Sequence, residues 1–278
     1  MPSYAEWTAA QTSATVSVDG HELDVAYYDE GSSDPVVFLH GIPTNSFLWR
    51  DVIPPIAAER RVIVPDMLGY GNSSMFDGFD RSIRAQEEMI TGLLSALDVR
   101  SPSLVGHDLG GGVLLRYAAH NPGAVDELVL SNSIAYDSWP IQLITDLGLP
   151  ETARETDVEE LQAMLDDLFR ETLYGNEHSE TFLDGMTAPW NSEAGVTSLV
   201  RNAVSTNTNH TTEIDPRSIT ARTLLLWGAA DQFQPIEWAE RLQEDIGTAD
   251  VIGLDGANHW VMEDRPDAYR DELADFLL

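Results

Sequence analysis

Short apolar runs alternate with longer amphipathic stretches along most of this chain. Continuous apolar runs rich in β-branched residues are typical of strands buried on both faces, and they occupy residues 35–41, 61–66, 102–108, 125–133, 221–228 and 249–256. Helical spacing of apolar residues follows at 81–98 and 267–278, and an opening hairpin is indicated at 14–18 and 22–31 around the Asp19-Gly20 turn. Strands that alternate with helices predict an α/β fold, a mostly parallel sheet with helices on both faces.

One segment breaks the alternation. Residues 137–217 contain helical patterns, such as 157–174 and 192–204, but no run typical of a buried strand. An all-helical insertion between two strands is interpreted as a lid over the carboxyl ends of the sheet. We therefore expect a core domain formed by residues 1–136 and 218–278, and a helical cap or lid formed by residues 137–217.

The length and composition set further bounds. A chain of 278 residues with 43% hydrophobic residues is long enough for one large domain with a proper core. It contains no cysteine, which excludes disulfides and thiolate chemistry. The first residues lack a basic region followed by an apolar one, and no apolar run reaches the ~18 residues of a membrane span. These features predict a cytoplasmic protein.

The charge of the chain is unusual. Forty-seven acidic residues face 15 basic ones, all of them arginine, and the net charge is −32. Such a chain repels phosphate backbones and anionic lipids, so nucleic acid and membrane surfaces are not expected as partners. Self-repulsion destabilises the compact state in dilute buffer, whereas at ~1 M salt the screening length falls to roughly 3 Å. An acidic, lysine-free composition resembles that of extremely halophilic proteins; an acidic protein of ordinary salt tolerance is the alternative.

The sequence "VGHDLGGGVLL" (105–115) carries the most informative motif. Gly106-His107-Asp108-Leu109-Gly110 fits the G-x-nucleophile-x-G pattern, with aspartate where serine usually stands. A strand-like run precedes it and a helix-like run follows, which is the context of a nucleophile elbow. Small residues are needed there because a tight strand–turn–helix leaves no room for side chains. A glycine-rich nucleotide-binding turn is the alternative, but the spacing of G-x-G-x-x-G is absent.

Two further residues follow in the order nucleophile, acid, histidine. Asp231 lies in a loop after one buried run and His259 lies after the last one. Each alone could be explained as a helix cap or a surface histidine; together with Asp108 they predict a catalytic triad. The loop that begins with His40-Gly41 offers the backbone N–H of Ile42, which would pair with that of Leu109 as an oxyanion hole.

The chain resembles the α/β-hydrolase fold over nearly its whole length. The segments "HGIP" (40–43), "PDMLGYGNSS" (65–74), "GHDLGG" (106–111), "GAADQFQP" (228–235) and "GANHWVMEDRPD" (256–267) carry the resemblance. With aspartate as nucleophile, the chain is similar to the branch that holds haloalkane dehalogenases, haloacetate dehalogenases and epoxide hydrolases. The resemblance implies a cofactor-independent hydrolase acting on a small apolar organic substrate and water.

The aspartate itself favours a particular reaction. A carboxylate that attacks an acyl carbon would form an anhydride, whereas at a saturated carbon it forms a stable alkyl ester without needing a base. His259, oriented by Asp231, would then activate a water that hydrolyses the ester. We therefore expect cleavage of a C–halogen bond or of the C–O bond of an epoxide through an aspartyl-ester intermediate.

The sequence offers several candidates for the group that stabilises the leaving atom. Leu109 stands where haloalkane dehalogenases usually carry tryptophan. Epoxide hydrolases use two lid tyrosines, whereas this lid offers only Tyr174, with Tyr136 at its edge, and neither lies in a motif of that family. The candidates for contact with the leaving group or substrate are Trp190, Asn207, His210 and Tyr174, each of which can also be explained as core or as polar loop.

Other functional classes are kept open. A lidded pocket that binds a small molecule without turnover, or one that supports cofactor-free oxygen chemistry, would fit the same fold. No metal-ligand spacing such as H-E-x-x-H occurs, so neither a metal nor an organic cofactor is expected. The oligomeric state is not predicted.

Overall fold

A single eight-stranded sheet forms the centre of the protein. In the computed structural model, which describes residues 2–175 and 179–278, the strand order is β1-β2-β4-β3-β5-β6-β7-β8. The first two strands pair antiparallel with each other, β2 pairs antiparallel with β4, and all other pairs are parallel. The strands are β1 (Thr12–Val18), β2 (His21–Glu30), β3 (Pro35–Leu39), β4 (Arg61–Pro65), β5 (Ser103–His107), β6 (Glu127–Ser131), β7 (Arg222–Gly228) and β8 (Ala249–Leu254). This confirms the predicted mostly parallel sheet.

The central strands are buried on both faces. Every residue of β5 is buried, and β3 and β7 are buried at all positions but the first. This is why these strands appear in the sequence as continuous apolar runs rather than as an alternation of apolar and polar residues. The edge strand β1 alternates instead, since its outer face meets solvent.

Helices pack on the sheet in groups. Helix α3 contacts both α4 and β1, α2 contacts α13, and α11 contacts β7 and β8. A short helix at the start of the chain was not expected, because it has only seven residues; Ser3 and Glu6 cap it reciprocally. The core helices are α1 (Tyr4–Ala10), α2 (Ile53–Ala57), α3 (Ile83–Ala96), α4 (Asp108–His120), α11 (Glu237–Asp245), α12 (Val261–Asp264) and α13 (Pro266–Leu277), with single turns η1 (Ser46–Trp49) and η3 (Pro216–Ser218).

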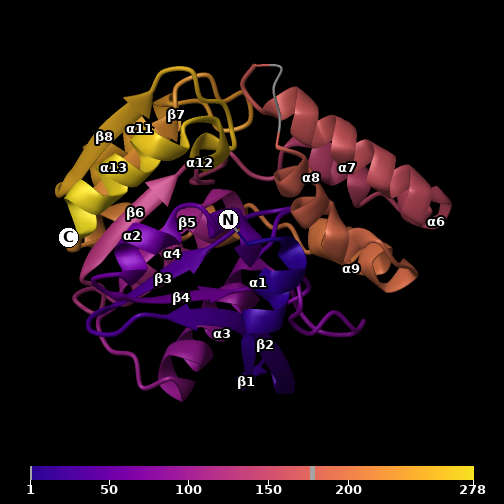
Figure 1. Ribbon diagram of the computed structural model, residues 1–278, viewed down its shortest axis with the longest axis horizontal. Helices are drawn as coiled ribbons and strands as arrows, with labels where there is room; N and C mark the ends of the chain where they lie inside the picture. The colour runs from indigo at the N-terminus through magenta and orange to yellow at the C-terminus, as the bar shows by residue number, and fades with distance from the viewer. Residues whose placement is uncertain (1, 176–178) are drawn as a thin grey trace.

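Between β6 and β7 the described residues form helices and no strand, as expected for this segment. Figure 1 shows α6 to α9 of this segment standing out at the upper right, beside the sheet. Helix α7 is amphipathic, buries Leu161, Leu165 and Phe169, and begins at a capping box formed by Asp157 and Glu160. The helices are α5 (Gln142–Leu147), α6 (Thr152–Glu155), α7 (Val158–Thr172), α8 (Glu180–Thr187), η2 (Ala188–Trp190), α9 (Glu193–Val204) and α10 (Asn209–Thr212). Of the expected domain ranges, residues 1 and 176–178 lie outside the described residues.

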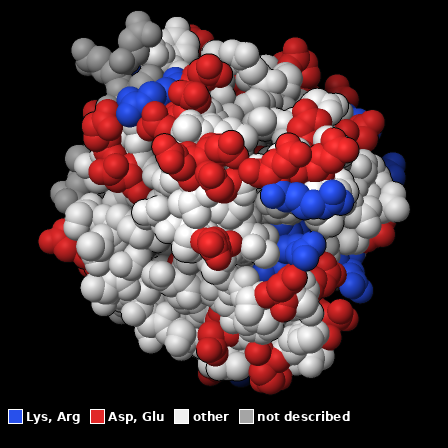
Figure 2. Space-filling view, turned by 90° about the vertical axis from the view of Figure 1, so that its right-hand side faces the viewer, with Lys and Arg blue, Asp and Glu red and all other residues white. Residues whose placement is uncertain are grey.

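Acidic side chains form patches on the face of the molecule that Figure 2 shows. This face lies on the right in Figure 1; Asp and Glu side chains gather most densely across its upper half, and Arg side chains form fewer groups. Among the described helices, none is both long and apolar enough to cross a membrane.

Candidate active site

The turn between β5 and α4 holds Asp108 in a sharp bend. Asp108 is the first residue of the helix and has a left-handed φ of 51°, a conformation that L-residues rarely adopt. A Cβ on Gly106 would come within 2.7 Å of the Cα of Gly111, and one on Gly110 within 2.2 Å of the backbone oxygen of His40. The expected strand–turn–helix context of the motif is therefore confirmed, and only glycine fits at positions 106 and 110, two residues before and two residues after Asp108.

The carboxylate of Asp108 is buried, with 4% of the residue exposed. Its Oδ1 accepts a hydrogen bond of 2.9 Å from the backbone N–H of Ile42. Burial raises the pKa of Asp108, and this outweighs the opposing effects of His259 and of the backbone N–H groups of Leu109 and Ile42, which lower the pKa. The two N–H groups predicted from the sequence thus contact this carboxylate, although its net pKa lies above the ordinary value.

His259 lies on the other side of the Asp108 carboxylate. Its Nε2 is 3.8 Å from Oδ2 of Asp108, and its Nδ1 is 2.9 Å from Oδ2 of Asp231. Burial alone would lower the pKa of His259, but the carboxylates of Asp231 and Asp108 raise it above its ordinary value. Burial would likewise raise the pKa of Asp231, but the charge of His259 and the hydrogen bonds to Asp231 lower it. The three side chains that the sequence singles out therefore lie together in a buried site, with His259 between the carboxylates of Asp108 and Asp231.

A fourth residue fixes Asp231 in place. Asn132, just after β6, donates from Nδ2 to Oδ2 of Asp231 at 2.6 Å and accepts at Oδ1 from the N–H of Gly228 at 3.0 Å. The other carboxylate oxygen of Asp231 accepts from the N–H of Phe233 at 2.8 Å. Asn132 itself has a left-handed φ of 43°, which asparagine tolerates better than most residues. The hydrogen bond between Asn132 and Asp231 was not predicted from the sequence.

The two other histidines near the site, His40 and His107, contact backbone groups of the surrounding loops. His40 accepts at Nε2 from the N–H of Met67 (3.0 Å), and its Nδ1 lies 2.9 Å from the backbone oxygen of Gly41. His107 lies with Nε2 2.9 Å from the backbone oxygen of His259. Burial lowers the pKa of His40 to about 4 and that of His107 to about 3, so both rings stay neutral near pH 7.

A small cavity opens beside Asp108 and His259. Its volume is about 20 Å³, which is room for about one water molecule. The remaining lining residues come from loops after the strands and from α5 and α7: Ile42, Pro43, Trp139, Ile141, Leu143, Ile144, Leu168, Phe233, Gln234 and Trp260. A second cavity of similar size shares Pro43, Leu143, Ile144 and Leu168 with the first and adds only Leu147, Met164 and Leu165. The space around the candidate nucleophile is therefore predominantly apolar.

Two of the four residues suggested for contact with the leaving group do not line the cavity beside Asp108. Trp190 is fully buried and donates its Nε1–H to the backbone oxygen of Pro43 at 2.8 Å, so this N–H is already used. Tyr174 is 54% exposed, and its side chain does not line the cavity beside Asp108. Both differ from the expectation because a sequence pattern in a helical segment does not tell which side chains face the sheet.

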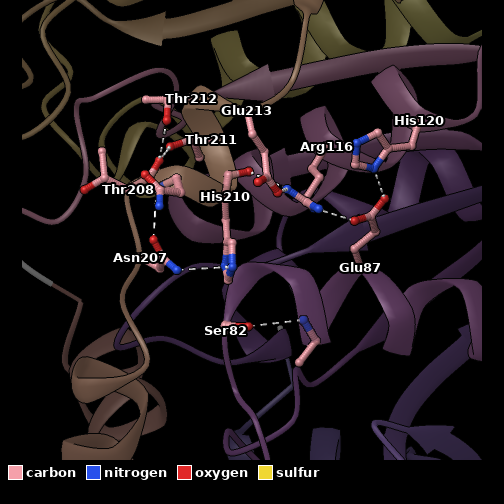
Figure 3. Close-up of polar contacts among 12 residues, drawn as sticks. Ser82, Glu87, Arg116, His120, Asn207, Thr208, His210, Thr211, Thr212 and Glu213 are labelled. Carbon is pink, nitrogen blue, oxygen red and sulfur yellow. Dashed lines mark hydrogen bonds and ion pairs between the residues drawn. The ribbon is translucent and has the colours of Figure 1, made fainter.

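The other two residues, Asn207 and His210, belong to a separate polar cluster. Figure 3 shows Asn207 directed at the ring of His210, and its Nδ2 lies 3.3 Å from Nε2 of that ring. Nearby, Arg116 of α4 bonds to the backbone oxygen of His210 and to the carboxylates of Glu87 and Glu213. Neither Asn207 nor His210 lines the cavity beside Asp108; the cluster ties α10 to the core helices.

Sequence reasoning missed Trp139 and Gln234, which do line this cavity. Their only signal in the sequence is their place, since each follows the end of a predicted strand by a few residues. No group of three or more His, Asp or Glu side chains among the described residues is arranged to hold a metal ion.

The fold and this site define the class of the protein. Residues 34–266 match the family model described as alpha/beta hydrolase fold, and the chain belongs to that family. It is 30% identical to a 2-hydroxy-6-oxononadienedioate/2-hydroxy-6-oxononatrienedioate hydrolase of Paraburkholderia xenovorans, over 97% of this chain and 96% of that one. It is 27% identical to haloalkane dehalogenase 2 of Mycobacterium tuberculosis, over 87% of each chain. Among solved structures, an alpha/beta hydrolase fold protein from Burkholderia ambifaria superposes with a TM-score of 0.85 at 25% identity, covering 94% of this chain and 97% of that one. The protein is accordingly a hydrolase of this fold.

Proposed function

We propose that this hydrolase cleaves a carbon–halogen bond, or the C–O bond of an epoxide, at a saturated carbon through an ester formed on Asp108. The observation that carries the proposal is the position of the Asp108 carboxylate. It lies on the elbow with Oδ1 tied to the N–H of Ile42, which leaves Oδ2 toward His259 and the cavity.

The first step uses Asp108 as nucleophile. Oδ2 forms a bond to the saturated carbon, and the electron pair of the breaking bond leaves with the halogen or the epoxide oxygen. An ionised carboxylate needs no base for this attack, unlike a serine hydroxyl. Because burial raises the pKa of Asp108, the ionised form is less stabilised here than in water, which also makes the carboxylate more reactive.

The second step uses His259 as general base. Its Nε2, 3.8 Å from the Asp108 carboxylate, is at a suitable distance to take a proton from a water that attacks Cγ of the ester. The N–H groups of Ile42 and Leu109 would hold the oxyanion that forms. The tetrahedral intermediate then collapses, the alcohol leaves with the proton that His259 returns, and the second proton of the water passes to solvent, so that Asp108 is ionised again. Asp231 stabilises the imidazolium during this step.

The helical segment 137–217 would serve as the lid that completes the substrate site. Trp139, Ile141, Leu143, Ile144 and Leu168 all come from it and form most of the apolar wall of the cavity. A small apolar substrate suits such a wall. The similarity to a haloalkane dehalogenase supports the same bond type.

Trapping the ester would test the proposal. The His259→Ala variant is incubated with a panel of haloalkanes and epoxides and then examined by denaturing mass spectrometry. We expect an alkyl adduct on the peptide that contains Asp108, because attack does not need His259 but hydrolysis does. Asp108→Asn in the same background is the matched control and should carry no adduct. If no substrate of either class gives an adduct or is turned over by the wild-type protein, the proposal is wrong and a binding protein on the same fold is favoured.

A further inference from the structure

The cavity beside Asp108 contains two buried polar groups that have no partner among the described residues. These are Nε1 of Trp139 and Oε1 of Gln234, on residues that are 3% and 1% exposed. The other tryptophan of the lining, Trp260, is different, because its Nε1–H donates to the hydroxyl of Thr172 at 2.7 Å. Trp139 and Gln234 therefore stand out in a lining that is otherwise apolar except for Asp108 and His259.

Leaving such groups unpaired is costly. More than about 90% of buried polar groups in proteins have a hydrogen-bond partner, and an unsatisfied one costs about 1–3 kcal/mol. The backbones of both residues are anchored by hydrogen bonds. The carbonyl of Gln234 accepts from Nε1–H of Trp227 at 2.7 Å, and the carbonyl of Trp139 accepts from the hydroxyl of Thr208 at 2.7 Å. Two unpaired polar side chains on anchored backbone, in the same cavity as a nucleophile, indicate a missing partner that arrives with the substrate.

We propose that Trp139 and Gln234 hold the leaving group of the reaction, and that this leaving group is a halide ion. The inference rests on the proposed function of Asp108. The indole is only a donor, and the carboxamide of Gln234 can rotate to present its NH₂ group, so each of the two residues can offer an N–H donor within the same cavity. When Oδ2 of Asp108 bonds to carbon, the carbon–halogen bond breaks and the halide keeps the electron pair, which the two donors then share in hydrogen bonds.

The chemistry of the pair favours a halide over an epoxide oxygen. The oxygen of an opened epoxide stays on the alkyl chain and must take up a proton, which requires an acid close by. Neither an indole nor a carboxamide is an acid, and no tyrosine is among the described residues that line this cavity. A halide needs no proton and leaves as the ion. The substrate class that fits is therefore a small haloalkane, with its alkyl chain against the apolar wall.

Binding of the ion tests the pair without any turnover. Sodium bromide is titrated into the ¹⁵N-labelled protein in a constant, high concentration of sodium sulfate, and the indole N–H signals are followed by NMR. The Trp139→Phe variant assigns one signal, and Trp49→Phe assigns a matched control, since Nε1 of Trp49 is equally buried and unpartnered but does not line the cavity. We expect the Trp139 signal to shift saturably with bromide, the Trp49 signal to stay, and Gln234→Leu to weaken the effect. A Trp139 signal that is indifferent to bromide overturns the inference, as does one that shifts only with a short 1,2-diol, which would point to an oxygen leaving group.

A second experiment tests whether Trp139 acts in the step that forms the ester on Asp108. In the His259→Ala background, Trp139→Phe should slow adduct formation from a 1-chloroalkane by about 10- to 100-fold, the value of a hydrogen bond to a charged atom. The loss should be larger for chloride than for bromide, a better leaving group, and Trp49→Phe should leave the rate unchanged. Equal rates with and without the indole N–H overturn the role of Trp139 while leaving the ester on Asp108 intact. The absence of any adduct refutes the ester instead, and the bromide titration still decides whether the pair binds a halide.

Discussion

Replacing Asn132 by aspartate would place a second carboxyl group against Asp231. Asn132 donates to Oδ2 of Asp231 at 2.6 Å, and the pKa of Asp231 is held below its ordinary value by His259 and by hydrogen bonds that include this one. The Asn132→Asp substitution keeps the shape and the tolerance of the left-handed conformation, but it replaces the amide donor with a carboxyl group that can donate only while it is protonated. Two ionised carboxylates this close cannot coexist in a buried site, so we expect the introduced group to keep its proton.

The size of the effect follows from the distance. Two unit charges 2.6 Å apart repel by about 6 kcal/mol at an effective dielectric constant of ~20. In the unfolded chain the introduced carboxyl titrates near about pH 4, whereas in the folded protein it stays protonated to much higher pH. Above about pH 4 the folded variant therefore binds one proton more than the unfolded chain, and its stability falls by about 1.4 kcal/mol per pH unit. Between about pH 4 and pH 7 the variant should lose roughly 4 kcal/mol relative to the wild type.

Urea unfolding in molar salt at several pH values measures this difference. The matched control is Asn132→Gly, which loses the same hydrogen bond without adding a carboxyl group and also accepts the left-handed backbone. Its loss of stability relative to the wild type should be nearly constant over the same pH range. If the deficit of Asn132→Asp does not grow with pH, the buried contact between positions 132 and 231 is not as described.

Three further predictions concern salt, pH and the elbow. With a net charge of −32, the melting temperature should rise from about 0.1 M to about 3 M KCl; no gain would argue against a halophilic protein. In the free enzyme the pKa of His259 is raised, so its ring should titrate in NMR spectra with a midpoint above ~6.5; a midpoint below that value would contradict the described contacts. Gly110→Ala should destabilise the fold by at least about 3 kcal/mol in thermal or urea unfolding, because its Cβ would lie 2.2 Å from the backbone oxygen of His40. Gly247→Ala, with nothing within 4 Å of the added Cβ, should be nearly neutral, and equal losses for the two variants would refute the steric argument.

The sheet and the elbow could be predicted because local rules fix them. A strand buried on both faces must be continuously apolar, and the bend at Asp108 requires glycine at positions 106 and 110. The line Asp108–His259–Asp231 also follows from sequence, since parallel strands end at one edge of the sheet and bring their loops together.

The residues of the lid side could not be predicted in this way. Trp190, Asn207, His210 and Tyr174 have suitable chemistry, but a helical pattern does not reveal how an inserted helix docks on the sheet. The hydrogen bond of Trp190 to Pro43 and the contacts of His210 with Arg116 exist only in the folded chain. Trp139 and Gln234, by contrast, become candidates only when the lack of a partner in the folded protein can be seen.

The small volume of the cavity beside Asp108 has a consequence for the rate of turnover. A space of about 20 Å³ admits no organic molecule, so residues that line the cavity must move before a substrate can reach Asp108 and again before a product leaves. Such gating motions occur in microseconds to milliseconds, and in many enzymes they set the turnover rate. If they set it here, the turnover rate will fall as the viscosity of the solvent is raised.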